Sequence, residues 1–228
     1  MKLKLEEKRK ENSDVFSFIF QPQEPVSWQA GQYMVYYIPH NNPDNRGETR
    51  HFTISSAPFQ KKIMLTTHYL FEESSSLKKT LFAHKPGDIV EGVKVDGTFT
   101  LRPEEKKLVF IAGGIGITPY HAMLLELVQN KDYRNIILLY SNKDEEHVVF
   151  KDTIESLTKE YPGLKVFYLF SPQRADAGFI QKTVPDFTER VFYLSGPIRM
   201  VKAVEEVLQQ LEVPLENIRK DYFPRVDE

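Results

Sequence analysis

The chain has 228 residues, enough for two domains of ordinary size, and its composition, 41% hydrophobic and 27% charged, is typical of a soluble globular protein. A formal net charge of −2 gives no broad basic surface, so binding to nucleic acid or to an anionic membrane is not expected. The sequence contains no cysteine, which excludes iron–sulfur clusters, disulfides and thiol nucleophiles. A redox centre in this chain would therefore be a bound organic cofactor, and no metal site is predicted.

The N-terminal segment and the apolar runs bear on location. The first twelve residues, MKLKLEEKRKEN, are charged throughout and lack the apolar centre of a signal peptide. The longest apolar run, Leu108 to Ile117, is too short to cross a bilayer. We therefore predict a cytoplasmic protein.

Short segments of alternating character recur before residue 102 and are separated by Gly, Pro and Asn turns. This pattern predicts antiparallel strands that form a barrel. One segment differs, because a serine cluster precedes two leucines four residues apart, which predicts a short capped helix. The predicted strands are KLKLEEKR, VFSFIF, YMVYYI, HFTIS, KIMLTTHY and DIVEG, and the predicted helix is SSSLKKTLFAH.

The polar stretch Leu101–Lys107 carries proline and clustered charge, as linkers often do. After it, fully apolar segments alternate with helical patterns, which indicates a parallel sheet covered on both faces. We predict an antiparallel Greek-key β-barrel over residues 1–102 and a doubly wound α/β nucleotide-binding domain over residues 103–228. In the second domain the predicted strands are LVFIAG, NIILLYS, LKVFYLF and RVFYLSG, and the predicted helices are Pro119–Gln129, Val148–Lys159 and Ile198–Leu211.

The segment IAGGIGITP joins a predicted buried strand to a predicted helix. Gly113, Gly114 and Gly116 allow backbone amides to approach a phosphate, whose charge a helix N-terminus favours. Thr118 is a natural cap, with Pro119 at the first helical position. The pattern predicts phosphate binding, and a tight strand-to-helix turn without a ligand is the alternative interpretation.

The type of nucleotide depends on the ends of the following strands. The glycine segment is not G-x-G-x-x-G, and no acid stands at Tyr140–Lys143 to hold a ribose 2′-hydroxyl. The next strand ends near Ser171 and Arg174, a hydroxyl and a cation that suit a 2′-phosphate. This pattern favours NADPH. NADH is the alternative, because Asp144 follows at once and could reach a ribose, and a solvated loop without a ligand would have much the same sequence.

A third strand, in YLSGPIRM, also passes through small residues and a proline into a helix. Ligands of open parallel sheets gather at the carboxyl ends of the strands, so Ser195, Gly196 and Pro197 are expected beside the glycine segment. The sequence S-G-P by itself is also a common turn.

The segment RHFTISS places charged and apolar side chains alternately on an extended stretch. On a strand, Arg50 and Phe52 share one face, and His51 and Thr53 share the other. A charge among apolar neighbours requires a counter-charge, and the sequence offers no acid on that face, so a diphosphate is the expected partner of Arg50. Alternatively, Phe52 is barrel core and His51 an ordinary polar residue.

Together these segments resemble the ferredoxin-NADP reductase superfamily over nearly the whole chain. In that family the motif R-x-[YF]-[ST]-x-x-S on a barrel strand binds the flavin, and RHFTISS matches each defined position. The resemblance implies that Arg50 pairs with the flavin diphosphate, that Phe52 packs on the isoalloxazine and that the Thr53 hydroxyl reaches N5. It also places His51 and Ser56 in the flavin site.

Further segments resemble family landmarks between barrel strands, namely Gly31-Gln32-Tyr33, Lys85-Pro86-Gly87-Asp88 and Asp96-Gly97-Thr98-Phe99. Thr66 and His68 fall where family strands contact the ribityl and phosphate portion of the flavin. A serine-rich helix start resembles the family's phosphate site, in a form that implies FAD rather than FMN. Its residues are Ser75, Ser76, Leu77 and Lys78.

The chain departs from the family pattern in two places. Many members have Cys-Gly where this chain has Ser195-Gly196, so a hydroxyl replaces the sulfur beside the nicotinamide. The usual C-terminal E-x-F-x-G-Y appears as DYFPRV, which begins at Asp221 and lacks the final Gly and Tyr. The resemblance implies Thr53, Ser195 and Asp221 as catalytic residues and Phe223 as a cofactor contact.

The resemblance implies an NAD(P)H-dependent flavoprotein oxidoreductase. It would transfer a hydride from NADPH to bound FAD and then deliver electrons to a separate protein such as a ferredoxin or flavodoxin. Reduction of a small molecule such as free flavin or quinone is the close alternative. A non-catalytic nucleotide-sensing subunit is an alternative of another class.

Overall fold

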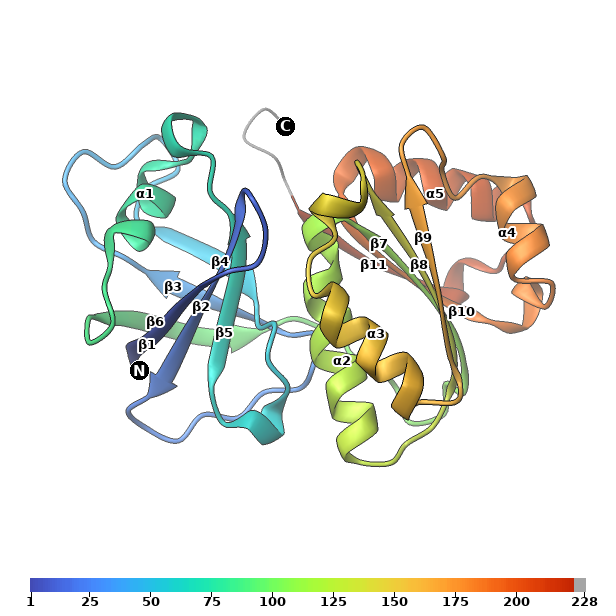
Figure 1. Ribbon diagram of the computed structural model, residues 1–228, viewed down its shortest axis with the longest axis horizontal. Coiled ribbons are helices and arrows are strands. Elements are labelled where there is room, and N and C mark those ends of the chain that lie inside the picture. Colours follow the sequence, from blue (N-terminus) through green and yellow to red (C-terminus); the bar gives the residue numbers. More distant parts are fainter. Residues whose placement is uncertain (224–228) are drawn as a thin grey trace. The chain divides into compact units, whose positions relative to one another are not determined.

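The computed structural model describes residues 1–223 and divides the chain into two compact units (Figure 1). The first unit comprises Met1–Thr100 and Thr118–Glu126, and the second comprises Leu101–Ile117 and the residues from Leu127 onward. The assignment of FAD to residues 1–102 and of NAD(P)H to residues 103–228 stays a prediction.

The first unit contains one antiparallel sheet in the order β4-β3-β6-β1-β2-β5. Its outer strands meet where Ile54, just after β4, forms a bridge with Leu65 on β5. The sheet therefore closes on itself, and the predicted antiparallel barrel is confirmed. The strands are β1 (Lys2–Lys10), β2 (Val15–Pro22), β3 (Tyr33–Tyr37), β4 (Thr49–Thr53), β5 (Ile63–His68) and β6 (Ile89–Asp96).

The barrel is filled by alternate residues of its strands, because successive side chains on a strand point to opposite faces. Leu3 and Leu5 of β1 and Met34 and Tyr36 of β3 are completely buried on this account. Helix α1 (Ser76–Ala83) begins where the Ser75 side chain accepts a hydrogen bond from the Lys78 backbone, and it adds Leu77 and Leu81 to the same core. The predicted short capped helix is therefore present.

The second unit is built on a parallel sheet in the order β11-β10-β7-β8-β9. Figure 1 shows α3 on one face of this sheet and α4 and α5 on the other, so the predicted doubly wound arrangement is confirmed. The strands are β7 (Lys107–Gly113), β8 (Asn135–Asn142), β9 (Leu164–Phe170), β10 (Val191–Pro197) and β11 (Ile218–Phe223). The helices that follow them are α2 (Thr118–Gln129), α3 (Lys151–Glu160), α4 (Ala177–Thr183) and α5 (Ile198–Gln210).

The structure differs from the sequence prediction at three elements. Helix α3 begins at Lys151 rather than at Val148, because Phe150 adopts a left-handed conformation with φ of 59° that interrupts the helix. Helix α4 was not predicted, since among its seven residues only Ile180 is buried and no apolar period is visible. Strand β11, IRKDYF, was not predicted because it is an outer strand with charges at three positions.

Two findings concern membranes and metals. Within residues 1–223, no helix combines the length and the apolar character needed to cross a bilayer. The same residues contain no group of three or more His, Cys, Asp or Glu side chains arranged to hold a metal ion. The cytoplasmic location stays a prediction.

Candidate active site

Arg50 of β4 is held by an acid and by backbone carbonyls. Its Nη2 donates to Asp44 Oδ1 at 3.0 Å, and its Nη1 donates to the carbonyls of Arg46, Gly47 and Thr49. The expectation that no acid would be available to Arg50 is therefore wrong. Asp44 comes from the loop between β3 and β4, which the alternation of residues along a strand does not reveal.

The start of α1 lies against the same carboxylate. The Ser76 backbone N–H donates to Asp44 Oδ2 at 3.1 Å, and the Ser76 hydroxyl accepts from the Asp44 backbone N–H at 2.9 Å. Burial, and then the charges of Arg46 and Arg50, lower the pKa of Lys78 to about 8. Three residues predicted to bind the flavin phosphates, Arg50, Ser76 and Lys78, thus meet in one cationic cluster.

The remaining residues of the β4 motif divide between the two faces of the strand. Phe52 is partly buried, packs against the barrel core and meets the edge of Tyr36 at a ring distance of 5.8 Å. His51 is exposed on the opposite face, with its ring 5.2 Å from that of Tyr33, and Thr53 is buried. The roles predicted for these residues toward the flavin stay predictions.

Other predicted flavin contacts have partners within the first unit. The Thr66 hydroxyl is 2.8 Å from that of Ser17, and His68 Nδ1 is 2.9 Å from Asp14 Oδ2. The Ser56 hydroxyl hydrogen-bonds to the backbone just before and within β5, and so fixes the turn after β4. Their predicted contacts with the cofactor stay predictions.

The glycine segment forms a 3-10 turn between β7 and α2. A Cβ on Gly116 would lie 2.2 Å from the Ser195 carbonyl oxygen, and one on Gly113 would lie 2.3 Å from Met200 Sδ. Gly114 instead has φ of +51° and no heavy atom within 4 Å of its Cβ position. Two of the glycines therefore allow close packing, and Gly114 faces the open space that a ligand requires.

Helix α2 continues directly from this 3-10 turn. Thr118 is thus its first residue rather than the cap before it, and Pro119 is its second. The one-residue difference lies within the usual uncertainty of a helix boundary. Proline is well tolerated there because the amides of the first turn have no partner within the helix.

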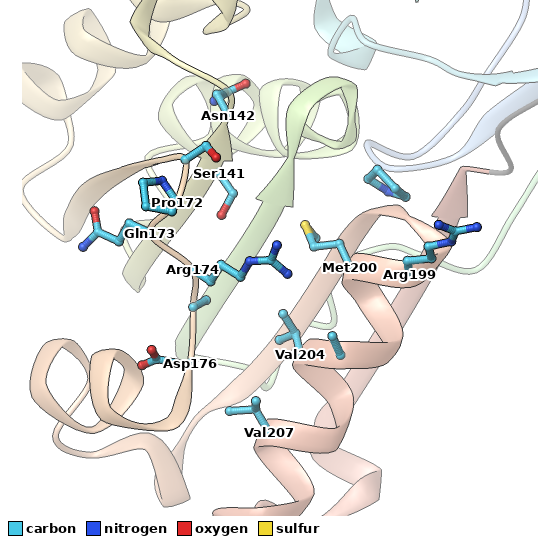
Figure 2. Close-up of a pocket in the computed structure, with 14 residues that line it drawn as sticks. Ser141, Asn142, Pro172, Gln173, Arg174, Asp176, Arg199, Met200, Val204 and Val207 are labelled. Atoms are coloured by element: carbon cyan, nitrogen blue, oxygen red, sulfur yellow. The ribbon is translucent and has the colours of Figure 1, made fainter.

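A pocket of about 500 Å³ opens at the carboxyl ends of β8 and β9 and beside the start of α5. Figure 2 shows the Arg174 side chain reaching from the segment after β9 towards Met200 on α5, with Arg199 one residue earlier on the helix. The pocket lining therefore combines hydroxyl and cationic groups with apolar side chains. The lining residues are Ser141, Asn142, Ser171, Pro172, Gln173, Arg174, Ala175, Asp176, Pro197, Arg199, Met200, Ala203, Val204 and Val207.

Ser195 lies on β10 opposite Asp221 of β11 in the parallel register. It is completely buried, and its hydroxyl has no hydrogen-bond partner among the described residues. Burial, opposed by the Tyr222 backbone N–H, raises the pKa of Asp221 to about 7. The backbone of Phe223 pairs with Pro197, whereas the predicted continuation of this segment, residues 224–226, lies outside the described residues.

Asp144, the acid that could bind a ribose hydroxyl, already forms hydrogen bonds with His147. Its Oδ1 accepts from the His147 backbone N–H at 3.2 Å and lies 2.5 Å from His147 Nδ1. The hydrogen bond from the His147 side chain lowers the pKa of Asp144. This carboxylate therefore caps the short 3-10 helix Glu145–His147.

Sequence reasoning missed three charged residues of these two sites. Asp44 and Arg46 lie in an irregular loop, where no period predicts which side chain meets α1. Arg199 had a usable signal, because it follows S-G-P in the first turn of a helix that begins at the carboxyl end of a parallel strand.

Comparison with known proteins gives one family model and distant relatives that match most of this chain. Residues 110–206 match the model described as an oxidoreductase NAD-binding domain. The chain is 27% identical to a flavohemoprotein of Bacillus cereus over 95% of its own length, and 26% identical to the phenol hydroxylase P5 protein of Acinetobacter pittii over 87%. It spans 59% and 58% of these two relatives, respectively.

Solved structures share the fold across the whole chain. A cytochrome P450 reductase of Amycolatopsis superposes with a TM-score of 0.85 at 20% identity, covering 99% of this chain and 70% of that one. The flavohem-like FAD/NAD binding domain of nitric oxide dioxygenase from Vibrio cholerae gives 0.85 at 21% identity, covering 98% of each chain. The ferredoxin-NADP+ reductase of Plasmodium falciparum gives 0.80 at 19% identity, covering 97% and 95%.

The predicted resemblance is confirmed by the domain model and by the two-domain architecture of these structures. Residues 110–206 match an oxidoreductase NAD-binding domain, and the chain has the two-domain fold of the ferredoxin-NADP reductases and flavoprotein reductase domains to which it is similar.

Proposed function

We propose that the chain binds FAD on the barrel and NADPH on the parallel-sheet unit, accepts a hydride from NADPH and passes electrons to a separate redox protein. The observation that carries this proposal is the pocket at the ends of β8 and β9. Its hydroxyls, Ser141 and Ser171, and its guanidinium groups, Arg174 and Arg199, form the donor set that a phosphorylated ribose requires.

The acids in and near this pocket already accept hydrogen bonds within the protein. Asp176 lines it but accepts a hydrogen bond from the Phe179 backbone N–H at 2.8 Å at the start of α4. Asp144 is engaged with His147. Both carboxylates keep their negative charge, but the lining contains two guanidinium groups, Arg174 and Arg199, against the single carboxylate of Asp176, which supports NADPH over NADH.

The cationic cluster on the barrel fits the phosphates of FAD. Arg50 and Lys78 supply positive charge, and the N-terminus of α1 supplies the Ser76 backbone N–H. Charge-assisted donors of this kind hold a diphosphate more strongly than neutral ones do. When bound, FAD would accept a hydride and release single electrons, and the side chains would bind and orient it.

Ser195 and Asp221 are the candidate groups at the nicotinamide end. Ser195 is a buried hydroxyl with a free hydrogen-bonding capacity at the ligand-bearing edge of the sheet. A nicotinamide carboxamide offers a donor and an acceptor that this hydroxyl can use. Ser195 would thus orient the reacting ring. Asp221, on the neighbouring strand, would place a carboxyl group at the same end of the site.

For the acceptor we propose a protein-borne redox centre, such as a ferredoxin or flavodoxin. The names of similar proteins include a flavohemoprotein, a phenol hydroxylase P5 protein and a cytochrome P450 reductase. Each name links the protein to a haem protein or an oxygenase rather than to a free small-molecule acceptor.

The test is the visible spectrum of the purified protein before and after anaerobic NADPH. The expected result is a yellow protein that releases FAD on denaturation and is bleached faster by NADPH than by NADH. A protein that stays colourless after incubation with FAD would contradict the proposal. Faster electron delivery to free flavin or quinone than to ferredoxin or flavodoxin would replace the proposed acceptor.

A further inference from the structure

Asp44, in the loop between β3 and β4, is bound by the groups proposed to hold the flavin phosphates. Its Oδ1 accepts from Arg50 Nη2 at 3.0 Å and from the Arg46 backbone N–H at 3.0 Å. Its Oδ2 accepts from the Ser76 backbone N–H at 3.1 Å and from Arg46 Nη2 at 3.3 Å. Two of these donors, on Arg50 and Ser76, belong to the proposed phosphate site.

The carboxylate is firmly ionised in this position. Partial burial acts to raise the pKa of Asp44, but the backbone N–H groups of Arg46 and Ser76 and the Arg46 guanidinium outweigh it and lower the pKa to about 2. The Asp44 side chain is 26% exposed and that of Arg50 17% exposed, so water screens their attraction only in part. Asp44 therefore acts as a bound anion at neutral pH.

Asp44 and a phosphate cannot use the same donors at once. A backbone amide has a single hydrogen, and that of Ser76 is given to Asp44. Of the terminal nitrogens of Arg50, Nη1 donates to three carbonyls and Nη2 donates to Asp44. A phosphate that takes the Ser76 backbone N–H must displace the carboxylate from it, whereas Arg50 Nη2 has a second hydrogen, so there the two anions compete for one guanidinium.

The cluster of Arg46, Arg50, Lys78 and Asp44 keeps a net positive charge. Arg46, Arg50 and Lys78 carry three positive charges against the single negative charge of Asp44, which leaves a net charge of +2 (3 − 1) when Lys78 is protonated. The lowered pKa of Lys78 shows that burial and the neighbouring cations prevail there. A dianionic diphosphate matches this charge, whereas the carboxylate of Asp44 neutralises only part of it.

The loop that carries Asp44 is fixed at its base and joined to α1 near its tip. At the base, the Ile38 backbone N–H donates to the Glu48 carbonyl at 2.9 Å, and the His40 backbone N–H donates to Glu48 Oε1 at 2.9 Å. Near the tip, Asp44 exchanges two hydrogen bonds with Ser76. Displacing the Asp44 carboxylate thus breaks one of these two hydrogen bonds, and it leaves the base of the loop and the bond from the Asp44 backbone N–H to the Ser76 hydroxyl intact.

We propose that Asp44 is an internal competitor for the flavin phosphates, a tethered carboxylate that occupies Arg50 and the N-terminus of α1 when the cofactor is absent. This inference rests on the proposed FAD site. Asp44 weakens cofactor binding through the phosphates alone and neutralises one of the positive charges of the cluster.

The test is titration of flavin-free protein with FAD and with riboflavin, followed by flavin fluorescence, in the parent and in Asp44→Asn. The expected result is FAD binding about fivefold tighter in the variant, the effect of one partly shielded charge, with riboflavin affinity unchanged. The matched control is Asp132→Asn, because Asp132 pairs with the arginine two residues later, as Asp44 does, but lies in the other unit. The control should bind FAD as the parent does.

Unchanged or weaker FAD binding in Asp44→Asn would overturn the inference and show that Asp44 merely holds Arg50 in place. Thermal unfolding with inorganic pyrophosphate separates this inference from the proposed function. If no form of the protein binds flavin, the proposed function fails, yet pyrophosphate should still raise the melting temperature of Asp44→Asn more than that of the parent or of Asp132→Asn. Equal pyrophosphate shifts would reject the competition, and Asp44→Ser serves as a second variant if the asparagine protein does not fold.

Discussion

Ser195 and Asp221 occupy paired positions on the adjacent parallel strands β10 and β11. The hydroxyl of Ser195 is buried without a hydrogen-bond partner in the described part of the chain, and burial raises the pKa of Asp221 to about 7. Unsatisfied buried polar groups and raised carboxyl pKa values are both costly to a fold and are concentrated at functional sites. We therefore predict that this pair lies at the nicotinamide end of the proposed site.

For Ser195→Ala we expect slower flavin reduction with little change in NADPH affinity, because a lost orienting contact acts on the barrier rather than on the phosphate anchors. Ser195→Cys should retain activity. The unfolding free energy of Ser195→Ala should stay equal or rise by up to about 1 kcal/mol, since an unsatisfied hydroxyl is removed. Stopped-flow bleaching under anaerobic NADPH and urea unfolding measure the two effects. An alanine variant reduced as fast as the parent at saturating NADPH would remove Ser195 from the mechanism.

The raised pKa of Asp221 implies a contribution to stability that depends on pH and has a definite sign. Its folded pKa of about 7 lies above its ordinary value of 3.8, so between these pH values the folded state binds more protons than the unfolded state. The contribution of Asp221 to the free energy of unfolding should therefore fall as pH rises from about 4 to about 7, and Asp221→Asn should remove this contribution. Urea unfolding over that range measures it, with Glu212→Gln, at an exposed position, as the control for charge. Parallel curves for the parent and Asp221→Asn would be evidence against the raised pKa.

Arg174→Ala should raise the KM for NADPH about tenfold or more and leave that for NADH nearly unchanged, because a charge-assisted contact to the 2′-phosphate is worth roughly 1.5–3 kcal/mol. Lys182→Ala, an exposed cation of α4 outside the pocket lining, should change neither value. Steady-state kinetics with both nucleotides provides the measurement. A parent with equal specificity constants for NADPH and NADH would refute the assignment.

Arg50→Ala should lower FAD affinity by about tenfold or more through the lost contact with the diphosphate, again a charge-assisted hydrogen bond. Arg9→Ala is the control, since Arg9 forms an exposed ion pair with Glu7. Fluorescence titration of the flavin-free proteins compares them. Retention of FAD by Arg50→Ala at the affinity of the parent would show that the phosphates lie elsewhere.

The glycine turn gives a matched pair of stability variants. Gly114→Ala meets no neighbouring atom and should cost about 1–2 kcal/mol, because φ of +51° is strained for an L side chain. Gly116→Ala should cost more, because its Cβ would lie 2.2 Å from the Ser195 carbonyl oxygen and neither backbone can yield easily. Urea unfolding ranks the two variants, and an equal or smaller loss in Gly116→Ala would contradict the close approach of the two backbones.

The strands and the glycine turn were predictable because their signals are local. Buried strands such as β7 and β8 are continuous apolar runs, and barrel strands alternate, so composition and period suffice. The motif around Arg50 was equally visible. Its counter-ion was not, because Asp44 meets Arg50 through an irregular loop whose path depends on the docking of α1.

Elements with little burial were missed for a related reason. Helix α4 buries only Ile180, and β11 is an outer strand with three consecutive charged residues, so neither produces an apolar pattern. Their positions are set by the sheet that they complete. The Asp221 environment follows from this placement and not from any property of the segment DYF.

The strand that carries the flavin motif is also the seam of the barrel. Just beyond Thr53, Ile54 bridges Leu65, and the Ser55 backbone N–H donates to the Met64 carbonyl at 2.8 Å. Closure therefore occurs within the RHFTISS segment itself. We therefore expect a cofactor bound to this segment, as proposed above, to stabilise the barrel at the place where the two outer strands of its sheet meet.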